Sequence, residues 1–211
     1  MIKILIADDH AIVREGLKQI VAEETDMKVL GEAGNSIELF ELLEKEKWSV
    51  VVLDINMPGK SGLEALKEMK VQYPSLPVLI LSMYTEDQYG LRAIKAGAAG
   101  YLKKVSAPGE LVKAIRKIVS GGKYISESLA EKLAASFEMN SRVQPHETLS
   151  DREYQIMCRI ASGKTAEEIA GEISISINTV YSYRNRILEK MNMKSNVELT
   201  QYVIQNKLIE I

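Results

Sequence analysis

Hydrophobic positions in the first half of the chain follow two alternating patterns. Short continuous apolar runs, as expected for strands buried on both faces of a parallel sheet, alternate with segments of helical spacing. The predicted strands are Ile2–Asp8, Lys28–Ala33, Ser49–Asp54, Val78–Ser82 and Gly100–Leu102. The predicted helices are Ile12–Ala22, Ile37–Lys45, Gly62–Val71, Asp87–Ala96 and Pro108–Ser120. This alternation predicts an α/β domain over residues 1–122, a five-stranded doubly wound parallel sheet.

The second half lacks strand patterning and carries repeated helix starts. In three capping boxes a hydroxyl accepts an amide hydrogen while a glutamate three residues later reaches back to the cap amide. The boxes begin at Ser150, Thr165 and Ser195. Ser176 marks a fourth start, so Thr165–Gly171 and Ile177–Met191 form two helices joined by a tight turn. We predict a small all-α four-helix domain over residues 148–211 that contains a helix-turn-helix.

Residues 123–147 resemble neither half in composition. Ser126–Phe137 is compatible with a helix, with Leu129 and Leu133 on one face. Glu138–His146 has no periodicity and includes a helix-breaking proline, so we predict a mobile tether. The predicted organisation is therefore two domains joined by a linker that contains one helix.

Carboxylates follow two of the predicted strands. Asp8 and Asp9 end the first strand and Asp54 ends the third. Ligands of such sheets bind past the carboxyl ends of the strands, where strand order reverses. Two carboxylates at 4 Å repel by roughly 4 kcal/mol at an effective dielectric of about 20. Oxygen ligands therefore predict Mg²⁺ or Mn²⁺ there, with the backbone carbonyl of Asn56 as a further ligand.

Two more polar residues lie at the ends of the last two predicted strands. Ser82 ends the fourth strand and Lys104 follows the fifth. A carboxylate beside a divalent cation, a lysine and a hydroxyl can accept a phosphoryl group, because the cations neutralise the transferring oxygens. The simpler alternatives are that Asp8 or Asp9 caps the first helix and that Asp54 starts a turn. We interpret His10 as a local packing or capping residue.

Three segments that contain the acids and the lysine resemble the receiver domain of bacterial response regulators. They are Ala7–His10, Leu53–Gly59 and Gly97–Lys104. The resemblance implies a flavodoxin-like fold and phosphorylation by a sensor histidine kinase. Its roles fall on Asp8 and Asp9 for magnesium, Asp54 as phosphoacceptor, Ser82 and Lys104 as phosphate partners, and Tyr101 as the switch aromatic. Lys103 leaves the lysine ambiguous by one place, and strand alternation favours Lys104.

The tail resembles the LuxR-type helix-turn-helix in Leu149–Glu153, Ile169–Ala170, Asn178–Val180 and Ile187–Met191. With the receiver in front, the whole chain resembles the NarL/FixJ group of transcriptional regulators. This resemblance implies binding to double-stranded DNA.

Helical spacing divides the candidate recognition helix into two faces. One is apolar and is expected to be buried, with Val180, Ile187 and Met191 among its members. The candidates for base readout on the opposite face are Tyr181, Ser182 and Asn185. The candidates for phosphate contacts are Thr179, Arg186, Lys190 and Lys164. The alternative is that these side chains only keep the domain hydrated.

Charge limits the strength of DNA binding. The net charge of the chain is −2, and the tail from Thr148 onward has eight basic and eight acidic residues. Glu167 and Tyr181 stand where related domains often have a basic residue. Because lost phosphate contacts weaken binding at every sequence, we expect weak binding by one copy and useful affinity from a homodimer formed on phosphorylation.

The remaining expectations concern location and class. No apolar run approaches the length of a membrane span, the start is unlike a secretory signal, and Cys158 is expected to be a core thiol. We therefore expect a cytoplasmic regulator and not an enzyme. A haloacid-dehalogenase-type phosphohydrolase is one alternative, but it needs a second acid where Asn56 stands. A regulator that works without phosphorylation is another, against which the acids and lysine argue.

Overall fold

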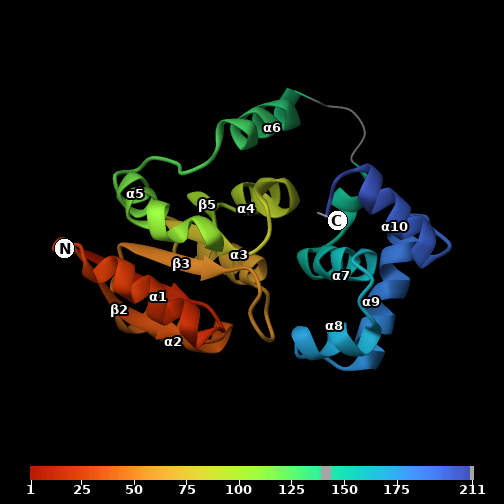
Figure 1. Cartoon of the computed structure of the whole chain (residues 1–211), viewed down its shortest axis with the longest axis horizontal. Helices are drawn as coiled ribbons and strands as arrows, with labels where there is room; N and C mark the ends of the chain where they lie inside the picture. The colour runs from red at the N-terminus through yellow and green to blue at the C-terminus, as the bar shows by residue number, and fades with distance from the viewer. Residues whose placement is uncertain (139–143, 210–211) are drawn as a thin grey trace. The chain divides into compact units, whose positions relative to one another are not determined.

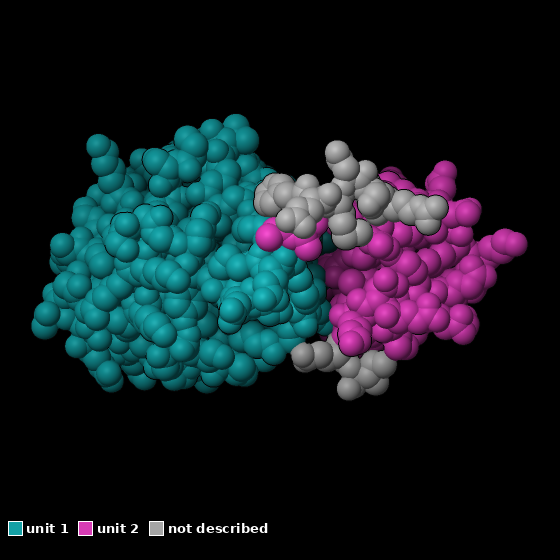
Figure 2. All heavy atoms as spheres, turned by 90° about the horizontal axis from the view of Figure 1, so that it is seen from above, with its two compact units in different colours: residues 1–133 teal, residues 134–211 magenta. Residues whose placement is uncertain are grey.

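The computed structural model describes residues 1–138 and 144–209. The chain divides into two compact units, Met1–Leu133 and Ala134–Ile211 (Figures 1 and 2). The first unit holds the strands and the second is helical. The predicted domain boundaries at 122 and 148 stay predictions, since the two compact units divide within a helix that lies between these positions.

The first unit contains the predicted five-stranded parallel sheet (Figure 1). Its strands are β1 (Ile2–Ala7), β2 (Met27–Ala33), β3 (Val50–Asp54), β4 (Val78–Ser82) and β5 (Gly100–Lys103). Their order is β2-β1-β3-β4-β5, and every neighbouring pair is parallel. The chain moves outward from β1 to β2 and then reverses to β3. The carboxyl ends of β1 and β3 therefore flank the point where strand order reverses, which is the usual ligand crevice of this fold.

Helices cover both faces of the sheet. The elements of this unit are α1 (Ala11–Ala22), α2 (Ser36–Lys45), α3 (Gly62–Gln72), η1 (Glu86–Gly90), α4 (Leu91–Lys95), η2 (Lys104–Ser106), α5 (Ala107–Val119) and the first part of α6 (Glu127–Glu138), which continues into the second unit. One continuous core joins Ile4 and Ile6 of β1 to Leu17 of α1 and Leu111 of α5. Right-handed crossovers place α2, α3 and α4 on the opposite face. The doubly wound fold is thus confirmed.

The fourth helix differs from its prediction. Instead of one helix over Asp87–Ala96, the chain forms the π-helix η1 and then the short α4. Wider π turns are uncommon and often occur at functional sites. Helix α6 lies against η1, where Lys132 pairs with Asp87 and Leu129 is buried beside Gly90.

The second unit confirms the small helical domain. Its elements are η3 (Pro145–Thr148), α7 (Asp151–Ala161), α8 (Ala166–Glu172), α9 (Ile177–Lys190) and α10 (Asn196–Gln205). Short connections between α7, α8 and α9 are typical of a helix-turn-helix. Cys158 is buried, as expected of a core thiol.

The helix starts of this unit mostly agree with the predicted caps. The boxes at Ser150 and Thr165 are complete, and Ser176 caps α9 through the Thr179 amide. The box at Ser195 is half formed. Its hydroxyl accepts from the Glu198 amide, but the Glu198 carboxylate accepts from the backbone of Lys194, one residue too early.

The predicted tether is corrected at its end. Residues 139–143 lie outside the described part of the chain. Pro145–Thr148 instead forms the 3-10 helix η3, and His146 Nδ1 lies 2.8 Å from the hydroxyl of Tyr202. This end of the segment therefore belongs to the second unit.

Candidate functional site

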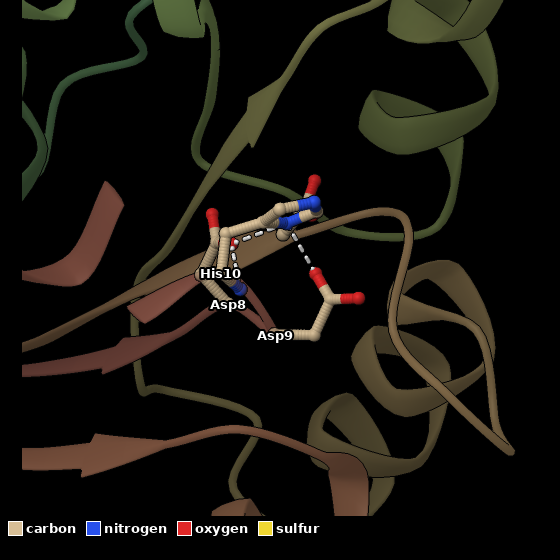
Figure 3. Close-up of side chains that lie close together, drawn as sticks. Asp8, Asp9 and His10 are labelled. Atoms are coloured by element: carbon tan, nitrogen blue, oxygen red, sulfur yellow. Dashed lines mark hydrogen bonds and ion pairs between the residues drawn. The ribbon is translucent and has the colours of Figure 1, made fainter. Parts of the chain in front are cut away.

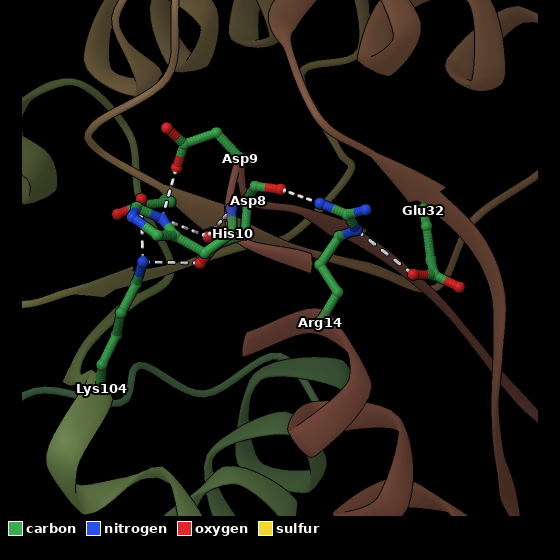
Figure 4. A network of polar contacts seen from close by, with 7 residues as sticks. Asp8, Asp9, His10, Arg14, Glu32 and Lys104 are labelled. Carbon is green, nitrogen blue, oxygen red and sulfur yellow. Dashed lines mark hydrogen bonds and ion pairs between the residues drawn. The ribbon is translucent and has the colours of Figure 1, made fainter. Parts of the chain in front are cut away.

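The carboxyl ends of β1 and β3 bring two acids into one buried pocket. Ala7 pairs with Leu53, so Asp8 and Asp54 follow at the same edge of the sheet. Their side chains are 1% and 2% exposed. The Lys104 ammonium lies between them, 2.6 Å from Asp8 Oδ2 and 2.9 Å from Asp54 Oδ2 (Figure 4). The lysine that reaches this pocket is thus Lys104.

Asp9 lies at the rim of the same pocket and faces His10 (Figure 3). His10 Nδ1 is 2.6 Å from Asp9 Oδ1 and 3.3 Å from Asp8 Oδ1. His10 occupies the N-cap position of α1, but its side chain makes no capping hydrogen bond. The expected capping position of His10 is therefore found, although the cap is formed by its backbone and not by its side chain. Its ring contacts the acid pair instead.

Burial shapes the proton affinities in the pocket. Burial raises the pKa of the Asp54 carboxyl to about 6, the Lys104 ammonium opposes that rise, and the Asp8 carboxylate adds to it. Burial alone lowers the pKa of Lys104, but the two carboxylates outweigh it and leave that pKa raised. Two buried acids with one lysine leave an excess of negative charge, which a further cation would relieve.

The donor atoms fit a divalent cation. Ligand atoms of Asp8, Asp9, His10 and Asp54 all lie within 4.8 Å of one another. Carboxylate oxygens suit Mg²⁺ and Mn²⁺. The residues present therefore fit the metal expected from the sequence. The Asn56 backbone hydrogen-bonds the Asp54 carboxylate, and a ligand role for its carbonyl stays a prediction.

Ser82 and Tyr101 lie at the ends of the neighbouring strands. Ser82 is fully buried at the end of β4, and its Oγ accepts from the Tyr84 amide at 3.1 Å. Tyr101 is 1% exposed, and its hydroxyl donates to the Tyr84 carbonyl at 2.9 Å. Burial raises the pKa of Tyr101. Both side chains thus contact the loop between β4 and η1.

Helix α3 begins directly against the backbone of Asp54. Ser61 and Glu64 form a complete capping box, and the Gly62 amide donates to the Ile55 carbonyl at 2.9 Å. A Cβ atom at Gly62 would lie 1.9 Å from the Asp54 carbonyl oxygen. Only glycine permits this approach.

The sequence reasoning missed Arg14. Its guanidinium donates through Nη1 to the Asp8 carbonyl at 2.7 Å and through Nε to Glu32 at 3.2 Å (Figure 4). A basic residue one turn into a helix gives little signal by itself. The contact becomes visible only when β2 is known to lie beside β1.

Helix α9 carries the candidate DNA-binding face of the second unit. Val180, Ile187 and Leu188 are buried, in agreement with the predicted apolar face. Tyr181, Ser182, Asn185 and Arg186 are exposed. Asn178, Thr179, Ser182, Tyr183 and Arg186 line a pocket of about 280 Å³.

Several basic candidates already have partners within this unit. Lys190 Nζ lies 2.7 Å from Glu153, and Lys164 pairs with Glu172. Arg186 lies over the ring of Tyr183, 5.8 Å from its centroid. Sequence reasoning did not predict these pairings.

Comparisons with known proteins identify both units. Residues 4–116 match the family "Response regulator receiver domain", and residues 147–203 match "Bacterial regulatory proteins, luxR family". Response regulator UvrY of Escherichia coli K12 is 37% identical over 99% of this chain and 96% of its own length. Response regulator GacA of Pseudomonas aeruginosa is 36% identical over 100% of this chain and 99% of its own length.

A solved structure extends the likeness. RcsB from Salmonella enterica serovar Typhimurium, bound to promoter rprA in the presence of phosphomimetic BeF3⁻, is 26% identical. It matches with a TM-score of 0.66 over 96% of this chain and 98% of that one. No helix in the described ranges has the length and apolar character needed to cross a membrane. The chain belongs to the two-component response regulators of the NarL/FixJ group, DNA-binding transcriptional regulators built from a receiver domain and a LuxR-type helix-turn-helix domain.

Proposed function

We propose that Asp54 accepts a phosphoryl group from a sensor histidine kinase, with Mg²⁺ or Mn²⁺ held by Asp8, Asp9 and Asp54. Phosphorylation then favours a homodimer that binds paired half-sites in DNA. In this proposal the chain acts in the cytoplasm as a regulator and not as an enzyme. The observation that carries it is the Lys104 ammonium held between the buried Asp8 and Asp54 carboxylates.

The pocket suits phosphoryl transfer to a carboxylate. An Asp54 oxygen forms the new bond to phosphorus while the bond from phosphorus to the kinase histidine breaks, and that electron pair stays on the imidazole. A metal ion held by Asp8, Asp9 and Asp54 would neutralise part of the charge on the phosphoryl oxygens. Lys104 neutralises a second part of the same charge. No general base is needed, because Asp54 above its pKa of about 6 attacks as an anion.

The output follows from the contacts of the neighbouring loop. A phosphoryl group adds a charge of about −1.5 to −2 at Asp54. The Ser82 hydroxyl and the Lys104 ammonium bind its oxygens, which draws in the β4–η1 loop that also accepts the Tyr101 hydrogen bond. Elements η1 and α4 follow directly and change the surface they expose. Moving the equilibrium from mostly off to mostly on requires about 5 kcal/mol of differential stabilisation.

We assign DNA contact to the exposed face of α9. Tyr181, Ser182 and Asn185 read base edges, while Thr179 and Arg186 contact phosphates. The further phosphate candidates are Lys164 and Lys190. Each must exchange a glutamate for a DNA phosphate. Because of this exchange and the neutral charge balance of the tail, one copy binds DNA weakly. Dimerisation on paired half-sites then supplies the useful affinity.

The proposal is tested with the full chain and acetyl phosphate in Mg²⁺. We expect wild type to become phosphorylated and dimeric, as measured by phosphate-affinity gels and light scattering, and Asp54→Asn to do neither. Asp26→Asn is the matched control, because Asp26 is an exposed acid paired with Arg116 outside the pocket.

Two outcomes would contradict the proposal. One is a dimer that forms in Asp54→Asn only when acetyl phosphate is added. The other is wild type that binds no beryllofluoride in the presence of Mg²⁺, which would favour a regulator independent of phosphorylation.

A further inference from the structure

The Asp8–Asp9 turn is fixed from one side by two consecutive residues of β2. The Asp8 amide donates to the Ala33 carbonyl at 3.0 Å. The Asp8 carbonyl accepts from Arg14 at 2.7 Å, and Glu32 holds the same guanidinium at 3.2 Å. Figure 4 shows Arg14 between the Asp8 carbonyl and Glu32, on the side of the turn opposite Lys104. Both backbone polar groups of Asp8 thus have partners that β2 supplies or holds.

These bonds orient a side chain that faces the other way. The Asp8 carboxylate points to Lys104 and accepts from the His10 amide at 2.9 Å. Asp8 is 1% exposed, so its side chain is enclosed by neighbouring atoms and has little room to reorient by itself. The direction of its carboxylate therefore depends on how its backbone is held. The adjacent Asp9 is 30% exposed and depends on the same turn for its direction.

The charges around Arg14 suit a site for a cation. A guanidinium beside a metal-binding turn would repel the metal if its charge were uncompensated. Glu32 compensates it, and Lys18, whose Nζ lies 2.8 Å from the other oxygen of Glu32, is itself balanced by Glu15 at 2.7 Å. The planar guanidinium can donate to a carbonyl and a carboxylate at once, whereas a lysine ammonium lacks this fixed geometry.

We propose that Arg14, held by Glu32, is a positioning residue for divalent metal binding by Asp8 and Asp9. It sets the backbone of the turn so that both carboxylates face one cation. This inference rests on the proposed function, because it assumes that the acids bind the metal. Residues that orient metal ligands in this way typically contribute about 10- to 100-fold to metal affinity.

The test is calorimetric titration of Mg²⁺ alone into the unphosphorylated full chain. We expect Arg14→Gln and Arg14→Lys to weaken Mg²⁺ binding by about 10-fold, since neither makes both contacts. Glu32→Gln should weaken it as well, because Arg14 then loses its second partner and its charge near the metal is uncompensated. The Arg14→Gln/Glu32→Gln double variant should bind like Arg14→Gln alone, because residues that act as a unit are not additive.

Arg116→Gln is the matched control. Arg116 also bridges two acids, at 2.6 Å from Glu24 and 2.9 Å from Asp26, and both of these acids lie outside the pocket. Thermal unfolding without metal is compared for both variants. If Arg14 has a purely structural role, Arg14→Gln should lower the unfolding temperature, but its Mg²⁺ affinity should change no more than that of Arg116→Gln.

The outcomes separate the inference from the proposed function. If wild type binds no Mg²⁺, the proposed function fails. If wild type binds and Arg14→Gln binds equally well, only the positioning role is overturned. If Arg14→Gln does not fold, the other two variants decide the question. Wild-type Mg²⁺ affinity in both Arg14→Lys and Glu32→Gln would then overturn the positioning role.

Discussion

Two lysines in this chain pair with a carboxylate at nearly the same distance in very different surroundings. Lys104 Nζ lies 2.9 Å from Asp54, and their side chains are 8% and 2% exposed. Lys190 Nζ lies 2.7 Å from Glu153, and their side chains are 43% and 5% exposed. The Glu153 carboxylate also accepts from the Ser150 amide at 2.8 Å, so it keeps a partner without the lysine. The buried lysine has little water to replace a lost partner, whereas the exposed one can exchange partners cheaply. Similar distances therefore do not imply similar strength. The Lys104 pair in the receiver is fixed, whereas Lys190 beside the DNA-binding face can exchange its partner.

The largest expected effect compares removal of these two lysines. Lys104→Ala leaves two buried carboxylates without a cation and should destabilise the metal-free receiver unit by about 3–5 kcal/mol at pH 8. Lys190→Ala should cost less than about 1 kcal/mol in the second unit. Urea unfolding followed by Trp48, the single tryptophan of the chain, measures the first. Hydrogen exchange in α9 measures the second, and equal losses would contradict the comparison.

The next largest effect concerns the free-energy cost of ionising Asp54 in the pocket. The folded pKa of Asp54, about 6, exceeds the usual value of 3.8, so the folded state loses stability as pH rises from about 4 to about 6 and carries the full cost above pH 6. Asp54→Asn should therefore be more stable than metal-free wild type by about 3 kcal/mol at pH 8. This difference should vanish as pH falls through 6 toward 4.

Asp26→Asn should have the opposite effect on stability and be less stable than wild type at pH 8. The hydrogen bond from Arg116 lowers the pKa of Asp26, so Asp26 contributes stability at pH 8 that is lost in acid. Trp48 fluorescence in urea at several pH values measures both variants. A gap between Asp54→Asn and wild type that is unchanged by pH would contradict the assignment of the cost to ionisation.

A smaller effect is expected on the exposed face of α9. Asn185→Ala should reduce discrimination between cognate and altered half-sites by about 1–3 kcal/mol, because base contacts carry sequence information. Fluorescence anisotropy with a panel of duplexes measures it. Uniform weakening across the panel would reassign Asn185 to backbone contact.

The smallest effect concerns phosphate contact. Arg186→Gln should weaken binding to all duplexes alike and reduce the slope of log affinity against log salt by about 1. Thr148→Ala serves as a control on the same unit, since its hydroxyl donates to the Pro145 carbonyl within η3. An unchanged salt slope in Arg186→Gln would exclude Arg186 from the phosphate contacts.

Local patterns predicted the fold and the composition of the pocket. Buried apolar runs predicted the strands, and parallel pairing required Asp8 and Asp54 to meet at one edge. The caps at Ser150 and Thr165 depend on residues three apart, so they too could be predicted.

Contacts between distant segments could not be predicted in this way. Arg14 meets Glu32 across 18 residues and Lys190 meets Glu153 across 37. Tertiary packing selects such pairs among many exposed charges of similar type. The π turn at Glu86–Gly90 was also missed, because its apolar spacing resembles that of an ordinary helix.

The close contact at Gly62 has a mechanical consequence. The start of α3 lies so close to the Asp54 carbonyl that a Cβ atom would not fit between them. Backbone contact at Gly62 would therefore resist a displacement of the end of β3 toward α3. Such a displacement requires the start of α3 to move with the strand.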